Sequence, residues 1–204
     1  MAATLAGTLP DLVIIPPTKT SPGLFWGVVL DVVVLADGGD VADAVALASH
    51  LALRDTRVPK TTLVQDPEGP TTFELDPEVS RATWLDPSQL CLSATVHVVG
   101  EQVIVDASAE EEACADTSVT VRVGRDGAIR SVNKREGGAL SPELLTRCIS
   151  TAATVARELV VAVEAQWSAG SIAGPSDSDV AALGPVHDGG ASLSLGTRVT
   201  VSRR

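Results

Sequence analysis

The stretch Val103–Leu140 restricts the fold of this 204-residue chain more than any other segment. Apolar residues with strand-forming side chains alternate with short polar breaks, and the Asp-Gly pair at 126–127 is typical of a tight turn between paired strands. The segment therefore predicts a strand that ends at a carboxylate, an acidic helical turn, and a hairpin. In chain order these elements are the strand ending at Asp106, the acidic run Glu110–Glu112, the strand Ser118–Val123, the turn Gly124–Gly127 and the strand Ala128–Asn133.

Two carboxylates in this block are candidate site residues. Asp106 ends the first strand and Glu112 follows six residues later, a spacing at which an enzyme could hold a divalent metal ion or a leaving group. The alternative is structural. Asp106 would then bond nearby backbone N–H groups, and the acidic run would begin a short helix, where negative charge suits the helix dipole.

Hydrophobic patterning predicts further elements on both sides of this block. The apolar run Leu24–Leu35 is typical of a strand buried on both faces. Asp40 is expected to cap a helix that ends near Arg54. A Ser-Pro-Glu sequence begins a long helix that ends near Trp167. Additional expected strands are Leu12–Ile15, Thr61–Val64, Thr71–Leu75, Leu90–Val99, Gln102–Val105 and an add-on strand within Leu193–Val201.

These elements predict an α+β chain with a mixed sheet and packed helices. Residues 1–11 are expected to be an N-terminal extension, 12–167 the folded domain, and 168–204 a flexible tail rich in Gly, Ser, Ala and Asp. The longest apolar run contains Asp31 and is too short to span a bilayer, so a soluble intracellular protein is predicted, with no membrane contact.

Composition limits the functions that are plausible. The net charge of −11 repels a phosphate backbone unless a local basic patch overrides it, and aromatic residues, which stack on bases, make up only 2 % of the chain. Arg130, Lys134 and Arg135 form a modest basic cluster, which is either an RNA contact or a solvated hairpin edge. The three cysteines, Cys91, Cys114 and Cys148, lack metal-site spacing and are expected to be small core residues. We expect no metal and no cofactor.

The residue pattern of the central block, VDA-x-x-EEEACADTSV-x-V followed by x-DG-x-I, resembles the RNase PH superfamily, and within it the ring subunits of the RNA exosome. The resemblance covers about residues 12–167. It implies an RNase PH-like fold, also called ribosomal protein S5 domain 2-like, from which an N-terminal part is missing. It also implies that Asp106 and Glu112 stand at the two acidic positions of active relatives, the second of which is usually Asp.

A departure from the family pattern argues against catalysis. In active relatives a Gly pair is followed by Thr and Arg, which hold the attacking phosphate, whereas here Gly38-Gly39 is followed by Asp40-Val41. Because positioning supplies most of the rate in phosphoryl transfer, the resemblance implies a pseudo-enzyme. The expected role is a structural exosome ring subunit in the nucleus, nucleolus and cytoplasm. Its partners would be other RNase PH-type ring subunits, cap subunits and RNA that passes through the assembled complex.

Two alternatives remain open at the level of sequence. One is an active phosphorolytic 3′-to-5′ exoribonuclease subunit, for which the Thr-Arg pair would be the discriminating feature. The other is an acidic α/β scaffold unrelated to RNA, which would not co-purify with ring and cap subunits.

Overall fold

The computed structural model describes residues 12–16, 23–30, 32–65, 72–86, 90–135, 137–170 and 197–202. The chain divides into two compact units. The first comprises residues 1–32, 51–89 and 195–204, and the second comprises residues 33–50 and 90–194.

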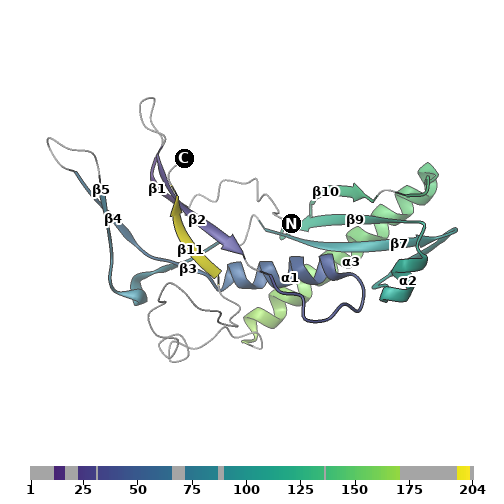
Figure 1. The fold of residues 1–204 in the computed structure, drawn as a ribbon, viewed down its shortest axis with the longest axis horizontal. Helices are drawn as coiled ribbons and strands as arrows, with labels where there is room; N and C mark the ends of the chain where they lie inside the picture. Colours follow the sequence, from purple (N-terminus) through teal and green to yellow (C-terminus); the bar gives the residue numbers. More distant parts are fainter. Residues whose placement is uncertain are drawn as a thin grey trace. The chain divides into compact units, whose positions relative to one another are not determined.

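A four-stranded antiparallel sheet forms the centre of the second unit (Figure 1). Its strands lie in the order β10-β9-β7-β8, and a turn at Gly100 joins β7 to β8. The observed bounds are β7 Cys91–Val99, β8 Gln102–Val105, β9 Thr117–Gly124 and β10 Ile129–Lys134. All described strand pairs in the chain are antiparallel, so the described sheets are not mixed.

One face of this sheet is apolar and lies against the helix α3, Pro142–Ser168 (Figure 1). The helix begins as the sequence predicts, because the Ser141 hydroxyl accepts the N–H of Leu144 and Pro142 occupies the first turn. Small side chains on α3 allow the helix to lie close to the valine-rich strands. The buried core consists of Ala94, Val96, Val98, Val119, Val121, Val123, Cys148, Ala152, Ala153 and Ala156.

The opposite face of the same sheet carries polar side chains, since strand residues alternate between faces. Ser93, Thr95 and His97 of β7 share this face, and all three are buried. Thr95 pairs with Thr120 of β9, and their hydroxyl groups are hydrogen-bonded at 2.9 Å. A buried polar face needs partners for its polar groups, and the segments that supply them define the candidate site.

Three small antiparallel sheets lie within the described residues of the first unit. The largest has the order β1-β2-β11, formed by Val13–Ile15, Leu24–Leu30 and Thr197–Ser202. The other two are the pair β3-β6, formed by Arg57–Val58 and Thr83–Trp84, and the hairpin β4-β5, formed by Thr61–Val64 and Thr72–Leu75. A short 3-10 helix, Val79–Arg81, lies between β5 and β6. The strand expected within Leu193–Val201 is confirmed as β11, whereas the turn of the β4-β5 hairpin lies outside the described residues.

The expectation of one buried strand over Leu24–Leu35 is wrong. β2 ends at Leu30, and residues 32–35 form no regular structure and are exposed, Leu35 by 87 %. The physical reason is pairing, since β1 and β11 hydrogen-bond only to the part of the run that ends at Leu30. Residues 171–196 lie outside the described residues, so the predicted domain limits and flexible tail stay predictions.

Helix α1 spans Val41–Arg54, and its residues up to His50 belong to the second unit. The acidic turn is confirmed as α2, Ala109–Cys114. Within the described part of the chain, no helix is both long and apolar enough to cross a membrane.

Candidate functional site

The turn that precedes α1 is fixed tightly to the segment that precedes α2. The Asp37 carboxylate accepts the N–H of Gly39 at 3.1 Å, and the Gly38 carbonyl accepts the N–H of Ala109 at 3.0 Å. Gly39 has a φ of +107°, and a Cβ at this position would collide with the carbonyl oxygen of Ala107. Glycine is therefore required here both for the backbone conformation and for the close approach.

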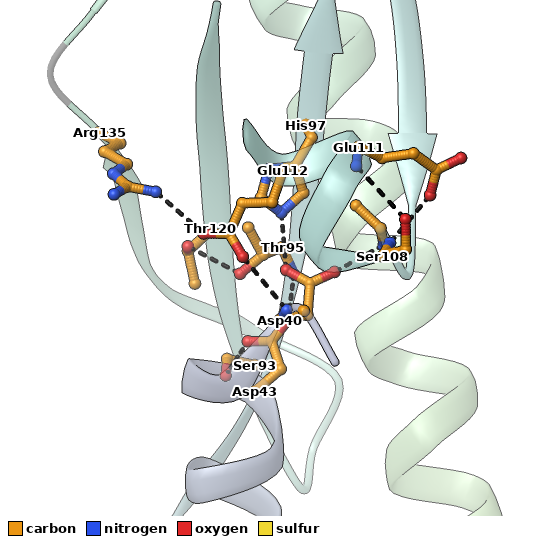
Figure 2. A network of polar contacts seen from close by, with 12 residues as sticks. Asp40, Asp43, Ser93, Thr95, His97, Ser108, Glu111, Glu112, Thr120 and Arg135 are labelled. Carbon is orange, nitrogen blue, oxygen red and sulfur yellow. Dashed lines mark hydrogen bonds and ion pairs between the residues drawn. The ribbon is translucent and has the colours of Figure 1, made fainter. Parts of the chain in front are cut away.

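Asp40 lies at the centre of the polar network (Figure 2). One carboxylate oxygen lies 2.6 Å from His97 Nε2, and the other accepts the N–H of Ala107 at 2.9 Å. The Asp40 N–H donates to Glu112 Oε2 at 3.4 Å. The sequence predicts that Asp40 caps α1. Its backbone carbonyl does accept the N–H groups of Asp43 and Ala44, but its side chain contacts His97 and does not cap the helix.

The Asp40 backbone has a φ of +46°, a left-handed conformation that is unfavourable for a residue with a side chain. The contacts of its carboxylate hold the residue in this conformation. Strain of this kind concentrates at functional sites.

Asp43 joins the first turn of α1 to strand β7. Its carboxylate accepts the Ser93 hydroxyl at 2.6 Å and the backbone N–H of Thr95 at 2.5 Å. β8 pairs with β7 only from Val96 onward, so this carboxylate supplies the acceptor that a neighbouring strand would otherwise provide.

Glu112 enters the network from α2. One carboxylate oxygen forms an ion pair with Arg135 at 3.0 Å, and the other faces the N–H of Asp40. The orientation of α2 is set by a capping box, in which Ser108 accepts the N–H of Glu111 and the Glu111 carboxylate accepts the N–H of Ser108. The Ser-x-x-Glu spacing was visible in the sequence, but we did not predict this motif.

A candidate metal donor set lies within this network. One donor atom each from Asp40, His97 and Glu112 lie within 4.8 Å of one another. The three residues come from the start of α1, from β7 and from α2 (Figure 2). An adjacent cavity of about 330 Å³ is lined by His97, Glu112, Ala113, Ala115, Asp116, Thr117, Ser118 and Arg135.

Asp106 does not belong to this network in the described structure. It directly follows β8, is exposed and has a φ of +54°. The expected bond from its carboxylate to nearby backbone N–H groups is absent among the described residues. Of the two acidic positions predicted from the sequence, only Glu112 therefore contacts Asp40. Asp40 and His97 were not predicted as site residues.

The three side chains of the predicted basic cluster all contact other groups of this chain. Arg130 forms an ion pair with Asp126 at 2.7 Å, and Arg135 pairs with Glu112. Lys134 donates to the backbone carbonyls of Arg135 and Gly137. All three side chains are exposed, and their role as an RNA contact stays a prediction.

The cysteines differ more from one another than we expected. Cys148 is fully buried in the core, as predicted, and burial raises the pKa of its thiol. Cys91 is half-buried, and burial raises its pKa as well. Cys114 is exposed at the end of α2, so the prediction of a core position is wrong for this residue.

Comparison with known proteins finds a family match within the second unit. Residues 90–155, from just before β7 into α3, match the 3′ exoribonuclease family, domain 2. The match spans the four-stranded sheet and the first part of α3. The resemblance to the RNase PH superfamily and the expected α+β fold of that superfamily are thereby confirmed.

Curated relatives extend the similarity beyond this domain. A putative exosome complex exonuclease RRP42 of Dictyostelium discoideum is 31 % identical over 64 % of this chain and 40 % of its own length. The exosome complex component Rrp42 of Methanopyrus kandleri is 33 % identical over 69 % of this chain and 50 % of its own length. The chain thus spans half or less of the length of these two relatives.

A solved structure described as an Archaeoglobus fulgidus exosome with RNA bound to the active site contains a similar chain. It is 28 % identical to this chain, with a TM-score of 0.46, and the match covers 61 % of this chain and 44 % of that chain.

Proposed function

We propose that this chain is a non-catalytic ring component of an RNA exosome that supports 3′-to-5′ RNA processing and degradation, including ribosomal RNA maturation and messenger RNA turnover. The proposal is supported by the exoribonuclease domain at residues 90–155 and by the similarity to two proteins whose names describe them as exosome components or exonucleases. The expected partners are other RNase PH-type ring subunits, cap subunits and RNA that passes through the assembled complex. The expected locations are the nucleus, the nucleolus and the cytoplasm.

The observation that carries the non-catalytic assignment is the position of the Asp40 carboxylate. It accepts the N–H of Ala107 and contacts His97 Nε2, so both groups are already paired with a carboxylate. Asp43 adds a second carboxylate in the same turn of α1. Two negative groups at this helix start repel inorganic phosphate, the nucleophile of phosphorolysis, so the nucleophile has no favourable position.

The active alternative rests on the acidic positions Asp106 and Glu112. An active site would need both carboxylates next to a bound phosphate and the scissile bond. Here one oxygen of Glu112 is paired with Arg135, and among the described residues the Asp106 carboxylate makes no contact with the network. These observations favour the structural role over the active one.

A phosphorolysis assay tests the catalytic half of the proposal. The purified chain, alone and together with ring partners, is incubated with end-labelled RNA, Mg²⁺ and high phosphate, and the release of nucleoside diphosphate is measured. We expect release to be no greater in samples that contain the chain than in samples without it. Phosphate-dependent release that Asp106→Asn abolishes would show that the chain is an active enzyme.

Co-expression tests the structural half. The tagged chain is expressed with RNase PH-type ring subunits and cap subunits, and the purified material is analysed by mass spectrometry and sedimentation. We expect a stoichiometric complex with ring subunits. Recovery of the chain alone, as a stable monomer under the same conditions, would favour the scaffold unrelated to RNA.

A further inference from the structure

We propose that Asp40, His97 and Glu112 form a binding site for a divalent transition-metal ion. The donor atoms, one imidazole nitrogen and two carboxylate oxygens, lie within 4.8 Å of one another (Figure 2). They come from three segments that are far apart in the sequence, so the fold brings them together, unlike the run of neighbouring acids in α2. The proposal does not depend on the exosome role.

His97 supplies an observation that is independent of the acidic residues. Its side chain is only 2 % exposed, and Nδ1 is buried without a hydrogen-bond partner in the described part of the chain. The imidazole is therefore held at one nitrogen only, by Asp40, and it forms part of the wall of the adjacent cavity. A buried imidazole beside two carboxylates is a common donor combination for metal ions in proteins.

The charge balance of the network also favours a cation. The side chains of Asp40 and Glu112 are only 11 % and 32 % exposed, and Arg135 forms an ion pair with Glu112. Arg135 binds one oxygen of Glu112 and leaves the other oriented toward Asp40. A dication between the two carboxylates would reduce their mutual repulsion, which is strong in a partly buried setting.

The geometry requires a small rearrangement on binding. Metal–ligand distances near 2.1 Å place two donors on one ion roughly 3 Å apart or more, whereas Asp40 Oδ1 and His97 Nε2 are now 2.6 Å apart. The carboxylate must therefore rotate away and exchange its histidine contact for the ion. The cavity of about 330 Å³ has room for water molecules that would complete the coordination shell.

The donor types indicate which ions should bind. Imidazole nitrogen combined with carboxylate oxygen suits Zn²⁺ and Mn²⁺, whereas Mg²⁺ and Ca²⁺ prefer sites made of oxygen alone. We therefore expect Zn²⁺ and Mn²⁺ to bind more tightly than Mg²⁺. This donor set is also distinct from the pair Asp106 and Glu112, because it omits Asp106.

The experiment uses the full chain, treated with chelator and dialysed, and titrates MnCl₂ and ZnCl₂ by calorimetry. We expect saturable binding of one ion, and pulsed electron paramagnetic resonance of the Mn²⁺ complex should show coupling to an imidazole nitrogen. Glu112→Gln should weaken binding by about tenfold or more. The matched control is Glu110→Gln, which removes the same charge from an exposed position of α2 and should leave binding unchanged.

Asp40→Asn provides a second variant, and circular dichroism checks that each variant is folded. The proposal is overturned if neither ion binds saturably, if the nitrogen coupling is absent, or if Glu110→Gln weakens binding as much as Glu112→Gln. The last result would mean that the ion responds only to the general acidity of α2.

Discussion

Asp43 accepts the backbone N–H of Thr95 through a carboxylate oxygen at 2.5 Å, at the point where β8 no longer pairs with β7. The same carboxylate accepts the Ser93 hydroxyl through its second oxygen. A side chain from the first turn of α1 thus replaces a missing strand at the sheet edge, and it positions Asp40 three residues earlier over His97.

Asp43→Asn should lower the free energy of unfolding by about 1–3 kcal/mol. The amide has only one oxygen that can accept, so either the Thr95 N–H or the Ser93 hydroxyl loses its partner in a part-buried position. Urea unfolding followed by circular dichroism measures the change. Glu158→Gln, the same chemical change at an exposed position of α3, should change the stability by less than about 0.5 kcal/mol. Equal stability of both variants would refute the proposed role of Asp43.

Ala152→Leu should destabilise the second unit by about 1–3 kcal/mol, because the added side chain cannot fit between α3 and the sheet. Ala152 is fully buried in the core. Ala162→Leu makes the same substitution at an exposed position of the same helix and should have almost no effect. The measurement is the midpoint of urea unfolding of each variant. Coincident midpoints for the two variants would contradict the described packing.

Cys114 should be the one thiol of the native chain that reacts rapidly with iodoacetamide. It is exposed, whereas Cys148 is fully buried and both Cys91 and Cys148 have pKa values raised by burial, which lowers the fraction of reactive thiolate. Mass spectrometry of labelled peptides over time measures the rates. Cys114→Ser should remove the fast phase, and a fast phase that persists in this variant would assign it to another cysteine.

Asp55→Asn should stabilise the chain at neutral pH. Partial burial raises the pKa of Asp55 above its ordinary value of 3.8, and nearby Arg57 only partly offsets this effect. The folded state therefore holds this proton more tightly than the unfolded state, so wild-type stability falls as the pH rises from about 3.8 through the folded pKa. The position of Asp55 just after the end of α1 adds an unfavourable interaction with the helix dipole.

The advantage of Asp55→Asn should accordingly be complete above the folded pKa and absent at pH values below 3.8. Unfolding free energies of the variant and the wild type at a series of pH values test this. An advantage that is the same at every pH would point to a cause other than ionisation of Asp55.

Most of the second unit could be predicted from the sequence because its signals are local. The Ser-Pro-Glu start of α3, the Asp-Gly turn before β10 and the valine alternation in β7 and β9 each determine structure over a few residues. The prediction of a strand over Leu24–Leu35 was wrong because the end of this strand is not determined locally. Where that strand ends depends on the length of its partners, β1 and β11, and β11 comes from the other end of the chain.

The candidate site was only partly predictable, since its contacts join residues that are far apart in the sequence. Glu112 was identified from its acidic context, but its contact with the Asp40 backbone spans 72 residues. His97 could not be identified as a site residue from the sequence, because a single histidine on a strand carries no spacing signal. Only the positive φ of Asp40, which no sequence pattern reveals, turns its carboxylate toward His97 instead of the α1 N–H groups.

The fully buried centre of the interface between α3 and its sheet consists of valine and alanine together with Cys148, and valine and alanine have few rotamers to lose on folding. The loss of side-chain entropy therefore opposes formation of this interface only weakly. Opening of the interface would likewise regain little side-chain entropy. We expect the amide protons of β7 and β9 to exchange with solvent only in rare, global unfolding events, which makes this layer the slowest-exchanging part of the second unit.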